Sequence, residues 1–322
     1  MIFGLDIGGA NTKAASSDGL IAESVYLPLW KNAPLGKVLQ RFAKLEPKAV
    51  AVVMTGELAD CFSCKSEGVE SIRSRILGAF NCPVHFWGIS GFGSQDLAGA
   101  NWSASAALVS RDVGDCLFVD MGSTTTGIIP IKGESLAART DYLRLARGEL
   151  IYTGLLRTSL GALLPAARIR GETIPLAPEF FAITADAYLV LGEISEERYT
   201  CDAPDGAGKS REAALQRLAR AICADLEEIG ESGALAIARQ VQNRQMRILV
   251  DALEGLARKH ELSRVAATGI GERSIAEAAS FLGLECVLLS DRYGSKISDI
   301  FPAYAVARLL ESNPVLGKGL EQ

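Results

Sequence analysis

The pattern of apolar and polar positions predicts two series of alternating strands and helices. Continuous apolar runs of strand length cover residues 2–7, 49–55 and 116–121. In the first series we expect strands at 2–7, 12–16, 21–27, 49–55 and 84–87, and helices at 35–44, 69–79 and 97–109. Three strands followed by alternating helices and strands predict an α/β unit with a mixed sheet.

The second series opens in the same way, with strands expected at 116–121, 124–131 and 135–139. Residues 140–260 are then expected to be mostly helical, with helices at 178–191, 211–229 and 234–260. A strand at 265–268, a helix at 273–282, a strand at 285–289 and a helix at 300–310 follow. A chain of 322 residues, 48% of them hydrophobic, can bury two cores. We therefore expect domains at 1–112 and 113–322, the second carrying a helical insertion at about 140–260.

One short sequence motif occurs twice, as F-G-L-D-I-G-G-A-N-T-K near the start and as L-F-V-D-M-G-S-T-T-T-G about a third of the way along the chain. Asp6 matches Asp120 and Gly8 matches Gly122, with identical spacing inside both copies. Each copy is typical of a buried strand, a tight glycine turn and a returning strand. The repetition predicts two related domains.

The chemistry of both turns suits a phosphate group. Glycines let backbone N–H groups approach an anion closely, and hydroxyl, amide and ammonium groups add donors. An aspartate at a strand end can hold a hydrated Mg²⁺ ion. We therefore predict that Asp6 and Asp120 bind Mg²⁺ through water and that, with Lys13, they act in catalysis. The predicted phosphate-binding residues are Gly8, Gly9, Asn11, Thr12, Gly122, Ser123, Thr124 and Thr125. The alternative is an ordinary glycine hairpin, which the matched repetition disfavours.

A second glycine turn follows the strand expected at 265–268. In V-A-A-T-G-I-G, Gly269 and Gly271 lead into a helix, which is typical of a nucleotide-binding turn and also of a simple strand-to-helix turn. The stretch T-C-D-A-P-D-G-A-G-K-S at 200–210 shares letters with a P-loop. It has neither the preceding strand nor the first glycine, so we interpret it as an exposed loop.

Together the two hairpins and the glycine turn resemble the actin-like ATPase superfamily. This resemblance implies duplicated actin-like (ribonuclease H-like) domains with mixed sheets, whose hairpins face one cleft. The segments M-T-G-E-L-A-D and R-T-D-Y-L-R-L-A-R-G-E-L-I-Y-T-G-L-L-R-T are similar to the hydantoinase/oxoprolinase-like branch. With A-N-W-S-A-S-A and P-A-Y-A-V-A-R-L added, the chain most resembles a small group tied to tetrahydromethanopterin-linked one-carbon metabolism.

The resemblance to that group implies a transferase of methanofuran biosynthesis, in which a phenol of γ-glutamyltyramine displaces diphosphate from an aminomethylfuran diphosphate. Under this hypothesis Asp141 or Glu149 is the base, although a cap or a solvated charge explains either carboxylate equally well. The implied substrate-binding residues are Asn101, Trp102, Tyr152 and Arg157. Two alternatives stay open: an ATP-dependent kinase or hydantoinase-like enzyme, and a nucleotide-binding scaffold without turnover.

Composition narrows the partners to small molecules. A net charge of −5 with scattered basic residues argues against nucleic acid, and no apolar run is long enough to span a membrane. The absence of a leader pattern and seven dispersed cysteines favour a cytoplasmic protein with reduced thiols. Cys61, Cys64, Cys82 and His85 fall near zinc-ribbon spacing, with plain thiols as the alternative. A homo-oligomer is left open.

Overall fold

The computed structural model describes residues 1–31 and 33–314, and the chain forms two compact units. Unit 1 comprises Met1–Phe118, Ile129–Arg147 and the chain from Val287 onward, and unit 2 comprises Val119–Ile128 and Gly148–Cys286. The domain boundary predicted at 112/113 was placed ahead of the second copy of the repeated motif. It falls between α3 (Asn101–Asp112) and β7 (Cys116–Met121). It stays a prediction, and residues 315–322 of the predicted second domain lie outside the described residues.

The first sheet has six strands in the order β3-β2-β1-β4-β5-β6. β1 pairs antiparallel with β2, whereas β1 with β4 and β4 with β5 are parallel, so the sheet is mixed as predicted. The bounds are β1 (Ile2–Gly8), β2 (Asn11–Ser16), β3 (Ala22–Tyr26), β4 (Ala49–Thr55), β5 (Val84–Gly88) and β6 (Gly91–Phe92).

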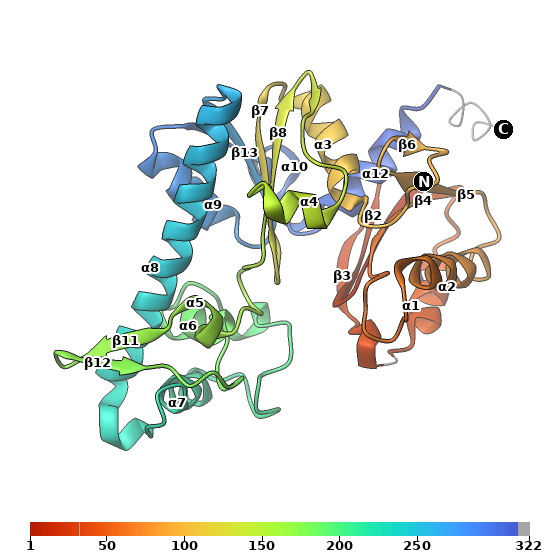
Figure 1. The fold of residues 1–322 in the computed structure, drawn as a ribbon. Coiled ribbons are helices and arrows are strands. Elements are labelled where there is room, and N and C mark those ends of the chain that lie inside the picture. Colours follow the sequence, from red (N-terminus) through yellow and green to blue (C-terminus); the bar gives the residue numbers. More distant parts are fainter. Residues whose placement is uncertain (32, 315–322) are drawn as a thin grey trace. The chain divides into compact units, whose positions relative to one another are not determined.

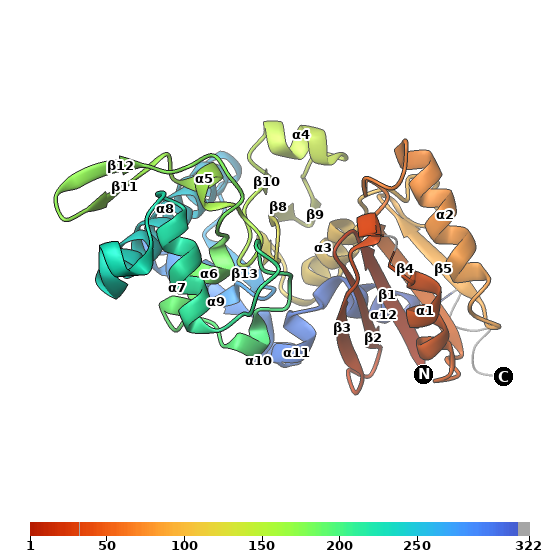
Figure 2. The same cartoon turned by 90° about the horizontal axis from the view of Figure 1, so that it is seen from below.

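Helices cover both faces of this sheet (Figure 2). On one face, Phe3, Leu5 and Ile7 pack in a core with α1 (Leu35–Ala43) and α2 (Lys65–Leu77). On the other face, small residues of β1 and β4 pack against α3 and α12 (Phe301–Glu311). The contact with α12 is so close that a Cβ at Gly4 would lie 1.9 Å from the carbonyl oxygen of Ala303.

The second sheet repeats the strand order of the first, with the path β10-β8-β7-β13-β14 and with β9 also on β8. The hairpin of β7 and β8 (Thr126–Lys132) takes the place of β1 and β2, and β13 (Arg264–Thr268) and β14 (Glu285–Leu288) take those of β4 and β5. This order confirms the predicted duplication of mixed sheets in an α/β protein.

The third strand of the second series was wrongly predicted at 135–139. Only β9 (Glu134–Ser135) forms there, and β10 (Leu150–Ile151) pairs with the other end of β8. Between them lies α4 (Asp141–Ala146), which Thr140 caps by accepting a hydrogen bond from the Leu143 N–H. The Ala137 N–H donates to the Ser135 hydroxyl, and the backbone bends between β9 and α4 instead of continuing as a strand.

The segment expected to be mostly helical contains a β-hairpin as well. β11 (Ala166–Ile169) and β12 (Glu172–Pro175) pair across Arg170 and Gly171, both at positive φ, and β11 packs against α8 (Figure 1). The other elements of this segment are α5 (Leu160–Leu163), α6 (Thr184–Val190), α7 (Arg211–Arg220) and α8 (Leu226–His260). The 3₁₀ turns are η1 (Leu29–Lys31) and η2 (Glu196–Arg198), and the last helices are α9 (Glu272–Phe281), α10 (Leu289–Tyr293) and α11 (Ser295–Ser298).

Three predicted helix bounds were wrong for local reasons. The helix expected at 178–191 begins at Thr184, because Asp186 accepts a hydrogen bond from the Ile183 N–H and fixes the first turn there. The helix expected at 211–229 ends at Arg220, and Asp225 caps a new helix that is kinked at Gly230, where φ is +68°. The helix expected at 97–109 begins only at residue 101.

A buried ion pair ties the 200–210 loop to the helices of unit 2. Arg217 lies 2.7 Å from Asp186, and both side chains are fully buried. The Tyr199 hydroxyl also donates to Asp186, and Arg217 donates to the carbonyl oxygen of Gly208. The segment that shares letters with a P-loop is therefore a loop, as predicted, and it is fixed from inside the protein.

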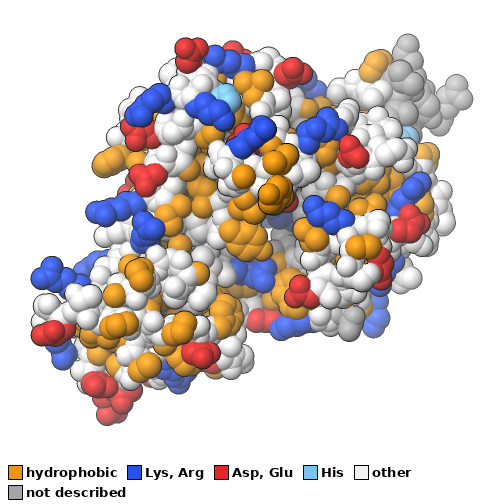
Figure 3. All heavy atoms as spheres, viewed as in Figure 1, with side chains coloured by type: hydrophobic (Ala, Val, Ile, Leu, Met, Phe, Trp, Pro, Cys, Tyr) orange, Lys and Arg blue, Asp and Glu red, His pale blue; other side chains and the backbone are white. Residues whose placement is uncertain are grey.

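Charged side chains of both signs are interspersed over the face shown in Figure 3. Within the described ranges, no helix has the length and apolar character needed to cross a membrane.

Candidate functional site

The first hairpin places Asp6 directly opposite Lys13. These residues are paired in the register of β1 and β2, so their side chains share one face of the sheet. Asp6 is 3% exposed and Lys13 is half-buried. Asp6 and Lys13 are thus neighbours on one face of the sheet near the end of β1, and their role in the predicted phosphate site stays a prediction.

The residues of the first turn differ in their access to solvent. Gly8, Gly9 and Asn11 are half-buried. Thr12 pairs with Ile7 and so faces the apolar core, where its side chain is fully buried and its Oγ1 makes no hydrogen bond. The predicted role of Thr12 in phosphate binding stays a prediction.

The end of β4 packs against this turn. The Gly56 N–H donates to the Ile7 carbonyl at 2.9 Å, and a Cβ at Gly56 would lie 3.1 Å from the carbonyl atoms of Gly8. The next residue, Glu57, therefore directly follows the residue that contacts the turn of the first hairpin.

The second hairpin turns at Gly122, whose N–H donates to the Thr125 carbonyl at 3.0 Å. Ser123 and Thr124 are half-buried, and Arg157 Nη1 donates to Thr124 Oγ1 at 3.1 Å. The Arg157 N–H also donates to the Ser123 carbonyl at 2.8 Å. The structure thus brings the predicted substrate-binding Arg157 to the predicted phosphate turn.

A buried hydrogen-bond network holds the segment that supports this hairpin. Gln245 of α8 donates to Thr153 Oγ1 and to the Gly154 carbonyl, at 2.7 Å and 2.8 Å. The Thr126 hydroxyl donates to the Thr153 carbonyl at 2.8 Å. A Cβ at Gly154 would lie 2.6 Å from the Gly122 carbonyl oxygen, so the two segments touch through their backbones.

The glycine turn after β13 packs on the end of β7. Gly269 has a φ of +91°, and a Cβ there would lie 2.5 Å from Asp120 Oδ1. The Gly271 N–H donates to the Met121 carbonyl at 3.0 Å, and a Cβ at Gly271 would overlap the Met121 side chain. These glycines are needed for packing within the protein, so their presence alone does not indicate a nucleotide.

Unit 1 also contains a pair of carboxylates that sequence reasoning identified only in part. Glu57 is 2% exposed, and its Oε1 and Asp141 Oδ2 both lie within 4 Å of the Cβ position of Gly99. Asp141 Oδ1 accepts from Arg144 at 3.0 Å, and the Arg144 guanidinium lies 4.8 Å above the Trp102 ring. Two residues predicted from the sequence, Asp141 and Trp102, are thus connected through Arg144.

Glu57 was missed as a site residue, although a signal existed. Thr55-Gly56 at the end of β4 repeats as Thr268-Gly269 at the end of β13, so the duplication extends to these two strands. Burial raises the pKa of the Glu57 carboxyl, and Asp141 raises it further, while nearby backbone N–H groups and Lys65 lower it.

The remaining predicted residues are dispersed. Asn101 opens α3 and is half-buried, Tyr152 is 68% exposed, and Glu149 is buried with its carbonyl accepting from the Ile128 N–H. Asp6 belongs to unit 1 and Asp120 to unit 2. The convergence of the two hairpins on one cleft stays a prediction.

The donor groups of each hairpin fit a hydrated Mg²⁺ ion, because carboxylate, amide and hydroxyl oxygens are hard ligands and Mg²⁺ needs few of them directly. Over residues 1–31 and 33–314, no three His, Cys, Asp or Glu side chains form a metal-binding group. Among the residues with zinc-ribbon spacing, Cys61 and Cys64 are exposed, Cys82 is half-buried and His85 packs edge-on against Phe92.

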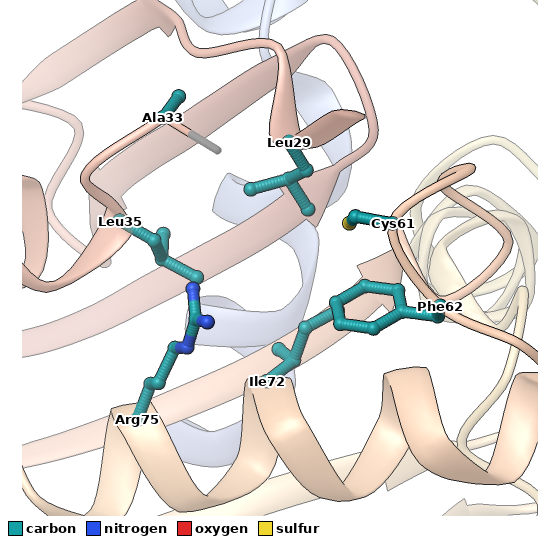
Figure 4. A pocket seen from close by; sticks show the side chains of 7 residues that line it. All are labelled: Leu29, Ala33, Leu35, Cys61, Phe62, Ile72 and Arg75. Carbon is teal, nitrogen blue, oxygen red and sulfur yellow. The ribbon is translucent and has the colours of Figure 1, made fainter. Parts of the chain in front are cut away.

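One pocket of about 150 Å³ opens beside α1 and α2 in unit 1 (Figure 4). Apart from Arg75 and Cys61, the residues that line it have apolar side chains. The lining residues are Leu29, Ala33, Leu35, Cys61, Phe62, Ile72 and Arg75.

Known proteins resemble the chain at the levels of family, sequence and fold. The hydantoinase/oxoprolinase family matches residues 48–313. The (4-{4-[2-(gamma-L-glutamylamino)ethyl]phenoxymethyl}furan-2-yl)methanamine synthase of Methanocaldococcus jannaschii is 40% identical over 97% of this chain and 98% of its own length. The synthase of the same name from Methanococcus vannielii is 34% identical over 64% of this chain and 96% of its own length.

Among solved structures, a ROK family glucokinase from Streptomyces griseus, in complex with glucose and AMPPNP, has a TM-score of 0.50 and 13% identity. The match covers 96% of this chain and 98% of that chain. At this identity the likeness shows the fold alone. It confirms the predicted class of duplicated actin-like (ribonuclease H-like) domains.

Proposed function

This chain belongs to the hydantoinase/oxoprolinase family, and we propose that it is a transferase of methanofuran biosynthesis that joins an aminomethylfuran diphosphate to the phenol of γ-glutamyltyramine. The observation that carries the proposal is the 40% identity to the Methanocaldococcus jannaschii synthase over nearly the whole chain. The name of that relative describes a phenoxymethyl furan, in which a phenol oxygen is bonded to a furfuryl carbon.

The reaction exchanges one carbon–oxygen bond for another. The phenol oxygen bonds to the furfuryl carbon, the bond from that carbon to diphosphate breaks, and diphosphate leaves with the electron pair. The phenol proton passes to a carboxylate. Because the furan ring stabilises positive charge on the reacting carbon, the main task of the protein is to stabilise the leaving diphosphate.

The residues at the two hairpins suit this task. Lys13 beside Asp6 offers an ammonium group to a phosphate, and Arg157 beside Thr124 offers a guanidinium and a hydroxyl. When bound through water at Asp6 or Asp120, Mg²⁺ would neutralise charge on the diphosphate. Asp141 and Glu149 stay the candidates for the proton acceptor, Asp141 being ion-paired with Arg144 and Glu149 being buried.

One incubation series tests the proposal. The purified protein with Mg²⁺ is given ATP, the aminomethylfuran diphosphate alone, or that diphosphate with γ-glutamyltyramine, and phosphate, diphosphate and coupled product are measured. We expect diphosphate and coupled product only when both organic substrates are present. Phosphate from ATP without coupled product would reject the transferase and favour the kinase-like alternative.

The proposal includes a cytoplasmic location and small-molecule partners.

A further inference from the structure

The strongest unexplained feature is the buried Glu57 carboxyl. Its side chain is 2% exposed, and its Oε2 makes no hydrogen bond. A buried polar atom without a partner is costly, and where a native protein keeps one, strain, a catalytic role or a bound water or ion explains it. The backbone fixes this position, because a Cβ at Gly68 of α2 would lie 2.2 Å from the Glu57 carbonyl oxygen.

Asp141 converges on the same point from another part of unit 1. Its Oδ2 lies 3.5 Å from the Cβ position of Gly99, and Glu57 Oε1 lies 3.9 Å from it. Gly99 has a φ of +60°, so the backbone disfavours a side chain here, while a Cβ would make ordinary van der Waals contacts with the two carboxylates. The space between the carboxylates is therefore kept free of protein side chains at this residue.

Each of the two carboxylates at this point has one basic residue that acts on it. Arg144 pairs with Asp141, and Lys65 lowers the pKa of Glu57. Asp141 in turn disfavours the ionised form of Glu57. A cationic ligand relieves that repulsion, whereas a neutral hydroxyl does not. An ammonium group also has three N–H donors, enough to reach both carboxylates.

We propose that Glu57 and Asp141 bind a primary ammonium group of a substrate beside Gly99. This inference rests on the proposed function, because both substrates of that reaction carry a primary amine. The aminomethyl group of the furan and the α-amine of the glutamyl moiety share this chemistry, and the experiment distinguishes them.

The test is calorimetric binding of matched pairs of probes. The first pair is the aminomethyl furan alcohol and its counterpart with a hydroxyl in place of the amine; the second pair is γ-glutamyltyramine and glutaryl-tyramine, which lacks the α-amine. We expect the wild-type protein to prefer the amine of one pair at least tenfold. Glu57→Gln and Asp141→Asn should each abolish that preference while leaving the affinity for the amine-free probe nearly unchanged.

Glu70→Gln is the matched control, because Glu70 is exposed on α2 near Glu57 in sequence. It should keep the wild-type preference. A second readout is proton release at a pH near 4.5. Because burial raises the pKa of Glu57 and a bound ammonium group would lower it, binding at that pH should expel protons, which makes the measured enthalpy depend on the buffer. Glu57→Gln should lose this buffer dependence.

Two results would overturn the inference: equal binding of both members in each pair by the wild type, or an amine preference that survives in Glu57→Gln and Asp141→Asn. Thermal melts establish that each variant is folded. If Glu57→Gln does not fold, Asp141→Asn provides the test, since Asp141 is partly exposed. Coupled product from a wild type without amine preference rejects this inference alone. A wild type that yields no coupled product rejects the proposed function instead.

Discussion

Replacing Gly154 with alanine should displace the second hairpin. The added Cβ would lie 2.6 Å from the Gly122 oxygen and the Thr124 nitrogen and 2.7 Å from the Ser123 carbonyl carbon, whereas ordinary contacts begin at 3.4 Å. All three are backbone atoms, so no side chain can rotate away. Overpacking of this kind costs about 1–3 kcal/mol of unfolding free energy.

The loss should extend to binding, because Leu155 and Arg157 hold the same turn through their backbone N–H groups. Urea unfolding measures stability, and calorimetry with inorganic diphosphate and Mg²⁺ measures binding at the turn. Gly255→Ala is the control: Gly255 lies inside α8 with no atom within 4 Å of the new Cβ, so we expect a gain of about 0.5–1 kcal/mol. A Gly154→Ala protein with wild-type stability and diphosphate affinity would refute the steric reasoning.

Three further predictions address charge. Asp186→Ala should cost about 3–5 kcal/mol in urea unfolding, because it leaves Arg217 charged and buried; a loss under 1 kcal/mol would contradict this. Asp6→Asn should abolish most coupled product with little change in the thermal melt, and wild-type turnover would speak against its role. Burial raises the pKa of Glu57 above 4.5, so the unfolding free energy of the wild type should fall relative to Glu57→Gln as pH rises above that value; parallel pH curves would count against it.

The sheets were predictable because their strands are buried on both faces. Such strands are continuous apolar runs in the sequence, and β4 and β7 have the predicted bounds, Ala49–Thr55 and Cys116–Met121. The hairpins were predictable because glycine and polar residues mark each turn at a fixed spacing from an aspartate.

The insertion was less predictable, because its structure depends on contacts distant in sequence. Arg168 of β11 exchanges backbone hydrogen bonds with the Gln240 side chain of α8, so the β-hairpin is stabilised by a helix 72 residues away. Propensity within the segment carries no signal of that partner.

The candidate site divides in the same way. Asp6, Lys13 and the turn residues were found from a repeated motif, whereas Glu57 is buried near Gly99 and Asp141, which are distant in sequence. The contact of Gly269 and Gly271 with Asp120 and Met121 was not predicted, because sequence spacing does not show which residues a glycine approaches.

The packing of α12 on β1 has a consequence for synthesis of the protein on the ribosome. The apolar face formed by Ile2, Ala49, Ala51 and Val53 packs against Val306, Ala307 and Leu310, which lie far later in the sequence. Unit 1 therefore stays incomplete until α12 has emerged, although its sheet is made first. A nascent chain must carry this sheet face without α12 while all of unit 2 is translated.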